Sequence, residues 1–139
     1  MTESRVIEGK AEPRGAYPHY KRAGDWIYVS GISARQAGQI IPGSEVDAAG
    51  TAKFDVEEQT RACIENVRDV LTAAGAGLED LVEITTFLVD MGDFGAYNRA
   101  YARFFDAASG PARTTVAVHQ LPHPHLRVEI KAIAWKPRG

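Results

Sequence analysis

The residues from Leu126 to Trp135 alternate in character, and this alternation constrains the fold more than any other feature of the chain. Successive side chains of a β-strand point to opposite faces of its sheet. One parity is wholly apolar and consists of Leu126, Val128, Ile130, Ala132 and Ala134. The other parity is mixed and consists of Arg127, Glu129, Lys131, Ile133 and Trp135. The apolar side predicts a face packed against the core, and the mixed side favours an interface between subunits.

Two kinds of periodicity give the order of the remaining elements. Residues 20–24 and 25–33 are typical of a β-hairpin, and residues 81–89 and 113–119 are typical of two further strands. Helices are predicted to begin at Asp55, with Glu58 in position for a capping box, and at Asp93, which opens an aromatic stripe. The loosest part of the chain, between Gln36 and Lys53, is predicted to be a loop or a loop with a short strand. The order β-β-α-β-α-β-β predicts an α+β fold, a mixed sheet with two helices on one face.

Length and charge bound the class of protein. A chain of 139 residues fits one domain, which we place at residues 1–139. The formal net charge of −2 provides no overall attraction to nucleic acid or to an anionic membrane surface. No apolar run reaches the ~18 residues of a membrane span, and the N-terminal residues lack the apolar segment of a signal peptide. We therefore expect a cytoplasmic protein with no nucleic-acid or membrane partner.

Two charged residues in the last two predicted strands suggest hydrolytic chemistry. Arg113 begins one strand, and a guanidinium can hold a substrate carboxylate through two parallel hydrogen bonds. Glu129 lies in the middle of the next strand, and a carboxylate can take a proton from water. Both residues have structural alternatives, because Arg113 can be a surface or interface arginine and Glu129 can belong to a cross-strand charge pair.

The remaining candidate side chains are less specific. Tyr17 can place its hydroxyl over a pocket or simply stiffen a loop, and Ser30 lies outside any G-x-S-x-G motif. The histidines at 119, 123 and 125 invite a metal hypothesis, but no Cys or carboxylate completes a known ligand spacing. These histidines are better explained as residues that shape a turn or line a pocket. We expect neither a metal nor a cofactor.

Six segments of the chain form an ordered set: GAYPH from Gly15, IYVSGIS from Ile27, EQTRACIENVRDVLTAAGAGLEDLVEITTFLVDMGDF from Glu58, YNRAYARFF from Tyr97, GPARTTVAV from Gly110 and VEIKAIAW from Val128. In this set the chain resembles the Rid (reactive intermediate deaminase) family, also called the YjgF family. The segment TTVAVHQLPHPHL from Thr114 is most similar to the members that deaminate 2-aminomuconate.

The resemblance implies a chorismate-mutase-like α+β fold and a homotrimer, in which the sheets form a central barrel and active sites lie between subunits. It implies that Arg113 binds the substrate carboxylate and that Glu129 positions or activates water. It also implies that the substrate pocket includes Tyr17, Ser30, Gly31 and Asn98. Thr115 occupies a position where the family often has cysteine, and Pro18 follows Tyr17 where the family has serine.

The function implied is the cofactor-independent hydrolysis of an enamine or imine carboxylate. The substrate expected from the subgroup is 2-aminomuconate, an intermediate of aromatic-compound degradation, which would give its 2-oxo or 2-hydroxy product and ammonia. This substrate has two carboxylates, and His119, His123, Arg127 and Arg35 are candidates for binding the second. A broad 2-imino acid deaminase and a non-catalytic carboxylate-binding module are the alternatives.

Overall fold

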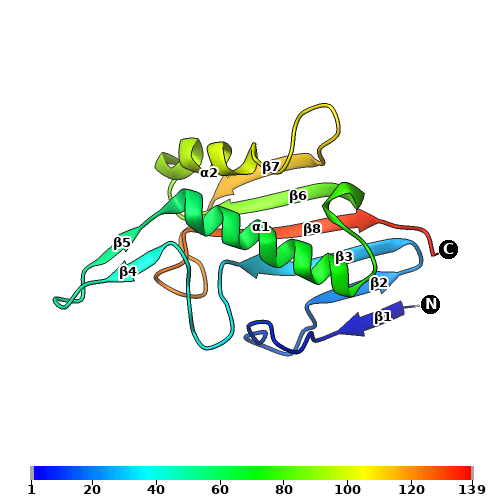
Figure 1. Ribbon diagram of the computed structural model, residues 1–139, viewed down its shortest axis with the longest axis horizontal. Helices are drawn as coiled ribbons and strands as arrows, with labels where there is room; N and C mark the ends of the chain where they lie inside the picture. Colours follow the sequence, from blue (N-terminus) through cyan, green and yellow to red (C-terminus); the bar gives the residue numbers. More distant parts are fainter. Residues whose placement is uncertain (1, 139) are drawn as a thin grey trace.

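A six-stranded sheet forms the body of the molecule in the computed structural model, which describes residues 2–138 (Figure 1). In spatial order its strands are β1 (Thr2–Arg5), β2 (Tyr20–Ala23), β3 (Trp26–Ser33), β8 (Val128–Trp135), β6 (Leu81–Leu88) and β7 (Ala112–Ala117). All neighbours pair antiparallel except β6 and β7, which are parallel. The last strand of the chain therefore lies inside the sheet, between β3 and β6.

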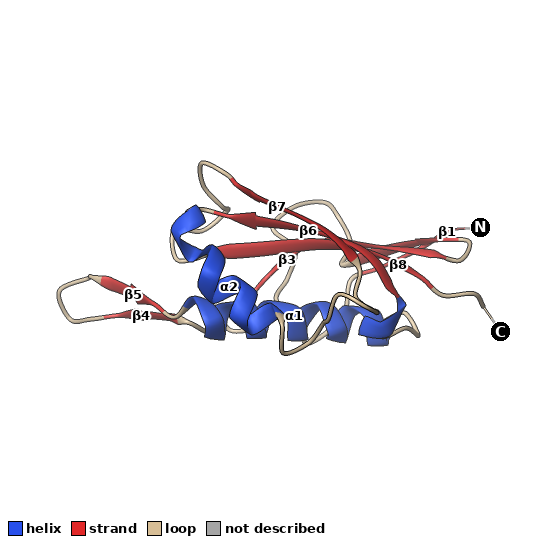
Figure 2. Ribbon diagram, turned by 90° about the horizontal axis from the view of Figure 1, so that it is seen from above, coloured by secondary structure: helices blue, strands red, loops and turns tan. Residues whose placement is uncertain are grey.

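Two helices cover one face of this sheet, as the view in Figure 2 shows. α1 (Val56–Ala73) packs on β3 and β8, and α2 (Phe94–Tyr101) packs beside α1. Short 3₁₀ turns, η1 (Leu78–Asp80) and η2 (Met91–Asp93), precede β6 and α2. Because parallel strands need a crossover connection, α2 also joins β6 to β7. The predicted mixed sheet with two helices on one face is confirmed.

Three short strands extend the predicted order of elements. β1 adds an edge to the sheet beside β2, and β4 (Ser44–Val46) pairs with β5 (Ala52–Phe54) in a separate hairpin. The hairpin lies in the region predicted to be a loop or a loop with a short strand, and it has two short strands rather than one. β1 was not predicted, because its sequence is short and polar and all four of its residues are exposed. Its position depends on main-chain pairing with β2 rather than on an apolar pattern.

The core lies between α1 and the sheet. The predicted apolar stripe of α1 is buried at Cys63, Val67, Val70 and Leu71. Facing it are the apolar side chains of the last strand, namely Val128, Ile130, Ala132 and Ala134, all at most 3% exposed. One side of the predicted alternation in β8 is thus confirmed as core. Truncating a buried leucine in such a layer typically costs about 2–5 kcal/mol of unfolding free energy.

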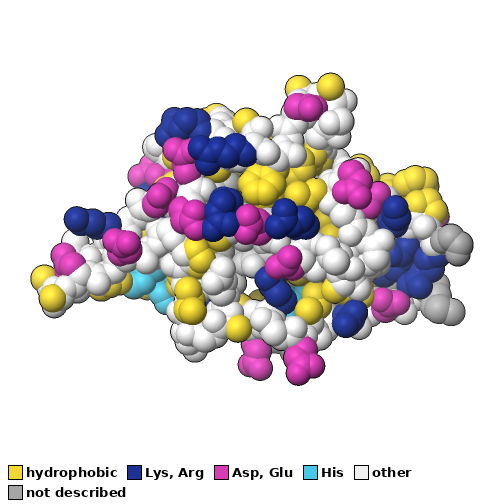
Figure 3. All heavy atoms as spheres, viewed as in Figure 1, with side chains coloured by type: hydrophobic (Ala, Val, Ile, Leu, Met, Phe, Trp, Pro, Cys, Tyr) yellow, Lys and Arg dark blue, Asp and Glu magenta, His cyan; other side chains and the backbone are white. Residues whose placement is uncertain are grey.

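The opposite surface of α1 carries alternating charges, which Figure 3 shows as a row of basic and acidic side chains. Arg61 pairs with Glu58 and Glu65, and Lys10 pairs with Asp69 at 2.8 Å. Exposed pairs of this kind contribute at most about 1 kcal/mol each. This row is therefore a solvated helix face.

Among residues 2–138, no helix has both the length and the apolar composition of a membrane span.

Asp55 begins α1 as predicted, but the capping box is only half formed. The Asp55 carboxylate accepts a hydrogen bond from the Glu58 backbone N–H at 3.1 Å. The backbone N–H of Asp55 donates instead to the carbonyl of Gly43 at 2.9 Å, and the Glu58 side chain pairs with Arg61. The hydrogen bond to Gly43 takes the place of the one that the Glu58 side chain would accept in a full capping box. It also ties the start of the β4 hairpin to the helix.

The face of the sheet away from the helices exposes large apolar side chains. Trp26 and Tyr28 of β3, Val116 of β7 and Trp135 of β8 are between 41% and 47% exposed. Trp26 and Trp135 are register partners on adjacent strands. Tyr28 lies two residues from Trp26 on the same face, so these three side chains cluster, whereas Val116 lies apart on the edge strand β7. Exposed apolar clusters often mark a site of protein contact. The mixed side of the β8 alternation thus has the composition expected of a surface that meets another subunit.

Gln59 connects α1 to the loop that leads into β8. Its side chain is fully buried, and its amide nitrogen donates to the carbonyls of Pro42 and His125. Its amide oxygen accepts from the backbone N–H groups of Arg127 and Val128. One side chain therefore satisfies four main-chain groups from two separate loops.

We expect Gln59→Leu to lower the free energy of unfolding by about 3 kcal/mol, because it leaves several buried main-chain groups without partners. Urea denaturation followed by circular dichroism measures this change. Gln120→Leu is the matched control, since Gln120 is exposed and the same substitution should change stability by less than about 0.5 kcal/mol. Equal effects at the two positions would contradict the role assigned to Gln59.

Candidate active site

A cleft opens at the end of β3, where the sheet is irregular. The register between β3 and β8 shifts between Val29 and Ile32, which marks a β-bulge. Bulges redirect neighbouring side chains, and Ser30 and Gly31 lie in the shifted stretch. The cleft offers about 600 Å³ of space with its open mouth included. Its walls come from the segment that precedes β2, the end of β3, α1 and the loop before β8.

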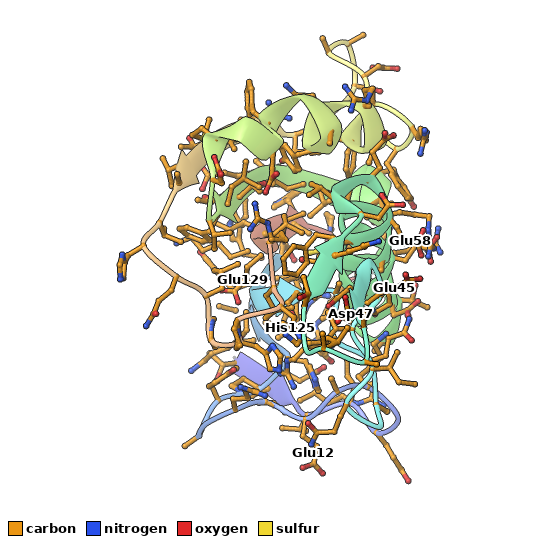
Figure 4. All side chains as sticks on the ribbon, turned by 90° about the vertical axis from the view of Figure 1, so that its left-hand side faces the viewer. Glu12, Glu45, Asp47, Glu58, His125 and Glu129 are labelled. Carbon is orange, nitrogen blue, oxygen red and sulfur yellow. The ribbon has the colours of Figure 1, made fainter. Side chains whose placement is uncertain are left out.

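Glu129 reaches this cleft from the start of β8. Figure 4 shows it within the molecule, whereas Glu12 projects from the lower edge of the view. Burial raises the pKa of the Glu129 carboxyl above its ordinary value of 4.5, and the charge of Arg35 acts in the opposite direction. A carboxylate with a raised pKa is a better proton acceptor than an ordinary glutamate.

Gly31 makes room for this carboxylate. A Cβ atom at position 31 would lie 2.6 Å from Oε2 of Glu129, which is closer than any side chain tolerates. The glutamate therefore rests directly against the backbone of β3. The SGIS sequence predicted a pocket-lining glycine only through the family resemblance, and the bulge that brings it to Glu129 has no local signal in the sequence.

The segment before β2 forms one lip of the cleft, and hydrogen bonds hold it in place. The Ser30 hydroxyl donates to the carbonyl of Pro18 at 2.7 Å, so this serine supports the lip and its hydroxyl proton is engaged. The hydroxyl of Tyr17 accepts from the backbone N–H of Arg14 at 3.2 Å. The Tyr17 side chain is 44% exposed and lines the cleft mouth.

His19 is a lining residue that sequence reasoning missed. Its ring is buried, with Nδ1 accepting from the backbone N–H of Ile7 at 2.8 Å and Nε2 facing the carbonyl of Ala11 at 2.9 Å. This pattern requires the neutral ring with its proton on Nε2. The imidazole thus fixes the path of the lip. The GAYPH segment contains the residue but gives no indication of these long-range contacts.

Arg113 does not line this cleft. Its guanidinium lies over three rings of the α2 region, at 5.8 Å from the centroid of Phe94, 5.0 Å from Tyr97 and 4.7 Å from Tyr101. Stacked rings of this kind hold a guanidinium by cation–π attraction. No carboxylate among residues 2–138 lies within 4.0 Å of it.

Within one chain, Arg113 and Glu129 stand on opposite faces of the sheet. Arg113 is the register partner of Ile84, and Glu129 is the register partner of Phe87, three residues further along β6. An odd separation along a strand places side chains on opposite faces. One subunit therefore does not bring the two predicted catalytic residues together.

The other predicted residues divide between these two places. Thr115 follows Arg113 on the same face of β7, and its buried hydroxyl has no hydrogen-bond partner among the described residues. Asn98 lies on α2, next to Tyr97, and is half-buried. The structure thus gathers Tyr17, Ser30, Gly31 and Glu129 in the cleft and leaves Arg113, Thr115 and Asn98 at the β7–α2 edge.

His123 borders a second depression, which adjoins the cleft and shares Arg14 and Arg35 with it. Its Nδ1 accepts from the backbone N–H of His125 at 3.0 Å, and the two rings meet edge to face at 5.0 Å. Burial lowers the pKa of His123, with further contributions from His125, Arg14 and Arg35. The ring is therefore a neutral turn-shaping group. Among residues 2–138, no three His, Cys, Asp or Glu side chains are placed to hold a metal ion.

Comparison with known proteins matches nearly the whole chain. The family model described as Endoribonuclease L-PSP matches residues 8–136. The RutC family protein PH0854 of Pyrococcus horikoshii is 36% identical over 138 residues, which cover 98% of this chain and 99% of that protein. The proposed reactive intermediate deaminase TdcF of Escherichia coli is 39% identical over 134 residues, which cover 94% of this chain and 95% of TdcF.

Solved structures share the fold described above. The crystal structure of a proposed endoribonuclease from Thermotoga maritima superposes with a TM-score of 0.79 at 33% identity and covers 98% of this chain and 99% of that one. The crystal structure of Escherichia coli TdcF with bound serine gives a TM-score of 0.77, with 96% and 99% of the two chains covered and 28% identity in that superposition. The resemblance to the Rid/YjgF family is thereby confirmed, and the chain belongs to that family.

Proposed function

We propose that this protein is a hydrolytic deaminase that converts enamine or imine carboxylates into oxo acids and ammonia. The observation that carries the proposal is the half-buried Glu129, which lies against Gly31 in the cleft and whose carboxyl has a raised pKa. The relative TdcF is named as a proposed reactive intermediate deaminase, and its crystal structure holds serine, a small carboxylate. Both names support an activity on small carboxylates.

We propose further that each active site is shared by two subunits of a homotrimer. The exposed apolar patch at Trp26, Tyr28 and Trp135 gives a neighbouring subunit a surface to cover. A neighbour that brings its β7–α2 edge to the cleft would place its Arg113 opposite Glu129. This arrangement accounts for an arginine that has stacking partners but no ionic partner among residues 2–138 of its own chain.

The reaction follows from these positions. Arg113 binds the carboxylate beside the reacting carbon of the imine tautomer through two hydrogen bonds. Glu129 accepts a proton from water, the water oxygen adds to the carbon of the C=N bond, and the nitrogen takes up a proton. The hydroxyl proton of the tetrahedral intermediate then passes to the nitrogen, the C–N bond breaks, ammonia leaves and a carbonyl forms. General-base catalysis of this kind contributes roughly 10²–10⁴-fold, and orientation of the substrate adds to it.

The substrate we propose is 2-aminomuconate, because the segment TTVAVHQLPHPHL resembles that subgroup. The alternative is a broad activity on small 2-imino acids, which the similarity to TdcF favours. Ammonia release from 2-aminomuconate, compared with release from an imine of pyruvate, separates the two. A carboxylate-binding module without activity would bind these acids and release no ammonia. The cytoplasmic location and the absence of nucleic-acid partners remain predictions.

A mixing experiment tests the shared site. Arg113→Gln and Glu129→Gln subunits should each be nearly inactive alone, and random co-assembly after mixing should restore about a quarter of the wild-type activity, because about one interface in four then carries both intact residues. Ammonia release measures the recovery. Mixing either variant with itself is the control. If each variant is inactive alone and the mixed trimers also stay inactive, both residues act within one subunit and the shared site is wrong.

The pH dependence of turnover reports on Glu129. Since burial raises the pKa of this carboxyl, the base is protonated, and turnover lost, at a pH where an ordinary glutamate is still ionised. The acid limb of the kcat profile should therefore lie above pH 4.5. When substrate is bound, its carboxylate offsets the charge of Arg113. The arginine then does not cancel the raised pKa of Glu129. Glu129→Gln should abolish this limb, and a residual variant activity with the same limb would assign it to another group.

Gly31→Ala tests the seat of the carboxylate. The added methyl group would displace the Glu129 side chain, so kcat should fall at least about tenfold while the substrate carboxylate still binds. Gly95→Ala is the matched control, because a Cβ there meets only the flexible end of Arg99 at 3.5 Å. Steady-state kinetics and the assembly state are measured for both. Wild-type kcat in Gly31→Ala would show that the contact with Glu129 is unimportant.

A further inference from the structure

Two arginines line the cleft that holds Glu129. Arg14 comes from the lip segment before β2, and Arg35 follows the end of β3, so the two approach from different parts of the chain. Both also line the adjoining depression, which continues the cleft outward. They therefore stand where the outer end of an elongated ligand would lie.

Main-chain carbonyls hold both guanidinium groups in place. Nη1 of Arg14 donates to the carbonyl of Pro122 at 2.7 Å, and Nη2 of Arg35 donates to the carbonyl of Glu12 at 3.1 Å. Proline at positions 13 and 122 stiffens the segments that carry Arg14 and its acceptor. A guanidinium has five N–H donors, so most donors of each group remain free.

No carboxylate in the described part of the chain forms an ion pair with either arginine. Among residues 2–138, none lies within 4.0 Å of either guanidinium, whereas Lys10 in the same cleft pairs with Asp69 at 2.8 Å. Glu129 lines the cleft with them and Glu12 lines the adjoining depression, so two arginines face one acidic side chain at the outer end. The cleft therefore has an excess of positive charge at its outer end, and the influence of Arg35 on the Glu129 carboxyl indicates that the two ends are within electrostatic reach.

We propose that Arg14 and Arg35 form a second carboxylate subsite, which makes the cleft selective for dicarboxylates over monocarboxylates. The inference rests on the proposed function, because it assigns the far end of the substrate whose near carboxylate Arg113 would bind. A diacid that enters the cleft meets the negative charge of Glu129, and the two arginines offset this repulsion. Free guanidinium donors form charge-assisted hydrogen bonds with carboxylates, often in pairs.

The other candidates for this role are engaged elsewhere. Arg127 pairs with Asp93 at 2.8 Å, and its guanidinium lies over the ring of Phe54. His123 uses Nδ1 to accept the His125 backbone N–H, so its ring offers at most one donor. His119 is exposed and lines neither the cleft nor the adjoining depression. Lys10 uses two of its three ammonium donors for Asn66 and Asp69. Among the described residues that line the cleft, the arginine pair therefore keeps the most free cationic donors.

The test compares two ligands that differ only in the second carboxylate. Muconate is a six-carbon diene with a carboxylate at each end, and sorbate is the same diene with a methyl group in place of one carboxylate. Neither has a nitrogen to hydrolyse, so calorimetric titration into the assembled protein measures binding without turnover. Wild-type protein should bind muconate roughly 10- to 100-fold more tightly than sorbate, as expected for one or two charge-assisted hydrogen bonds.

The double variant Arg14→Gln/Arg35→Gln should bind muconate at least about tenfold more weakly and sorbate with less than about a twofold change. Each single variant should give part of this loss, which keeps the test valid if the double variant does not assemble. Arg68→Gln/Arg103→Gln removes the same number of charges from exposed positions outside the cleft and is the matched control. Equal affinity of wild-type protein for both ligands, or equal losses for both in the double variant, would overturn the subsite.

A parallel assay keeps this outcome separate from the proposed function. Ammonia release by wild-type protein from an imine of pyruvate and from 2-aminomuconate tests the hydrolysis itself. Preference for muconate without any ammonia release would sink the deaminase proposal and leave the subsite intact. Ammonia release with no preference for muconate would support the deaminase proposal and overturn the subsite.

Discussion

The position of β8 inside the sheet is the constraint on which the rest of the structure depends. Hydrogen bonds to β3 on one side and β6 on the other fix its register, so its two faces cannot exchange roles. One face supplies the floor of the core under α1. The other carries Glu129 at the start of the strand and Trp135 at its end. Folding of the core therefore also positions the carboxylate.

The sequence predicts elements whose side chains follow a local period. The alternation of β8, the stripe of α1 and the β2–β3 hairpin all belong to this group, because burial of one face leaves a repeating pattern in the residues. The bulge in β3, the edge strand β1 and the contacts of His19 leave no such pattern. They depend on main-chain groups that meet across long sequence separations, and such meetings are visible only in the folded chain.

The candidate site shows the same division. Residue type and family resemblance pointed to Glu129, Gly31 and Arg113, but not to the faces on which they lie. The register of β6 with its two neighbours places Arg113 and Glu129 on opposite sides of one sheet. A chemistry that needs both residues then requires a second copy of the chain. Catalysis and assembly would in that case be lost together when the apolar outer face is disrupted.

The clamp made by Gln59 has a consequence for how this scaffold can change. The amide contacts the loop before β8 only through main-chain groups, at His125, Arg127 and Val128. The anchoring of this loop to α1 is therefore independent of the side chains at these three positions. Its exposed residues His119 and Gln120 make no such contact and are free to vary in size and charge, which makes this part of the loop a natural place for new ligand preferences to arise by substitution, or to be installed by library selection, without rebuilding the backbone.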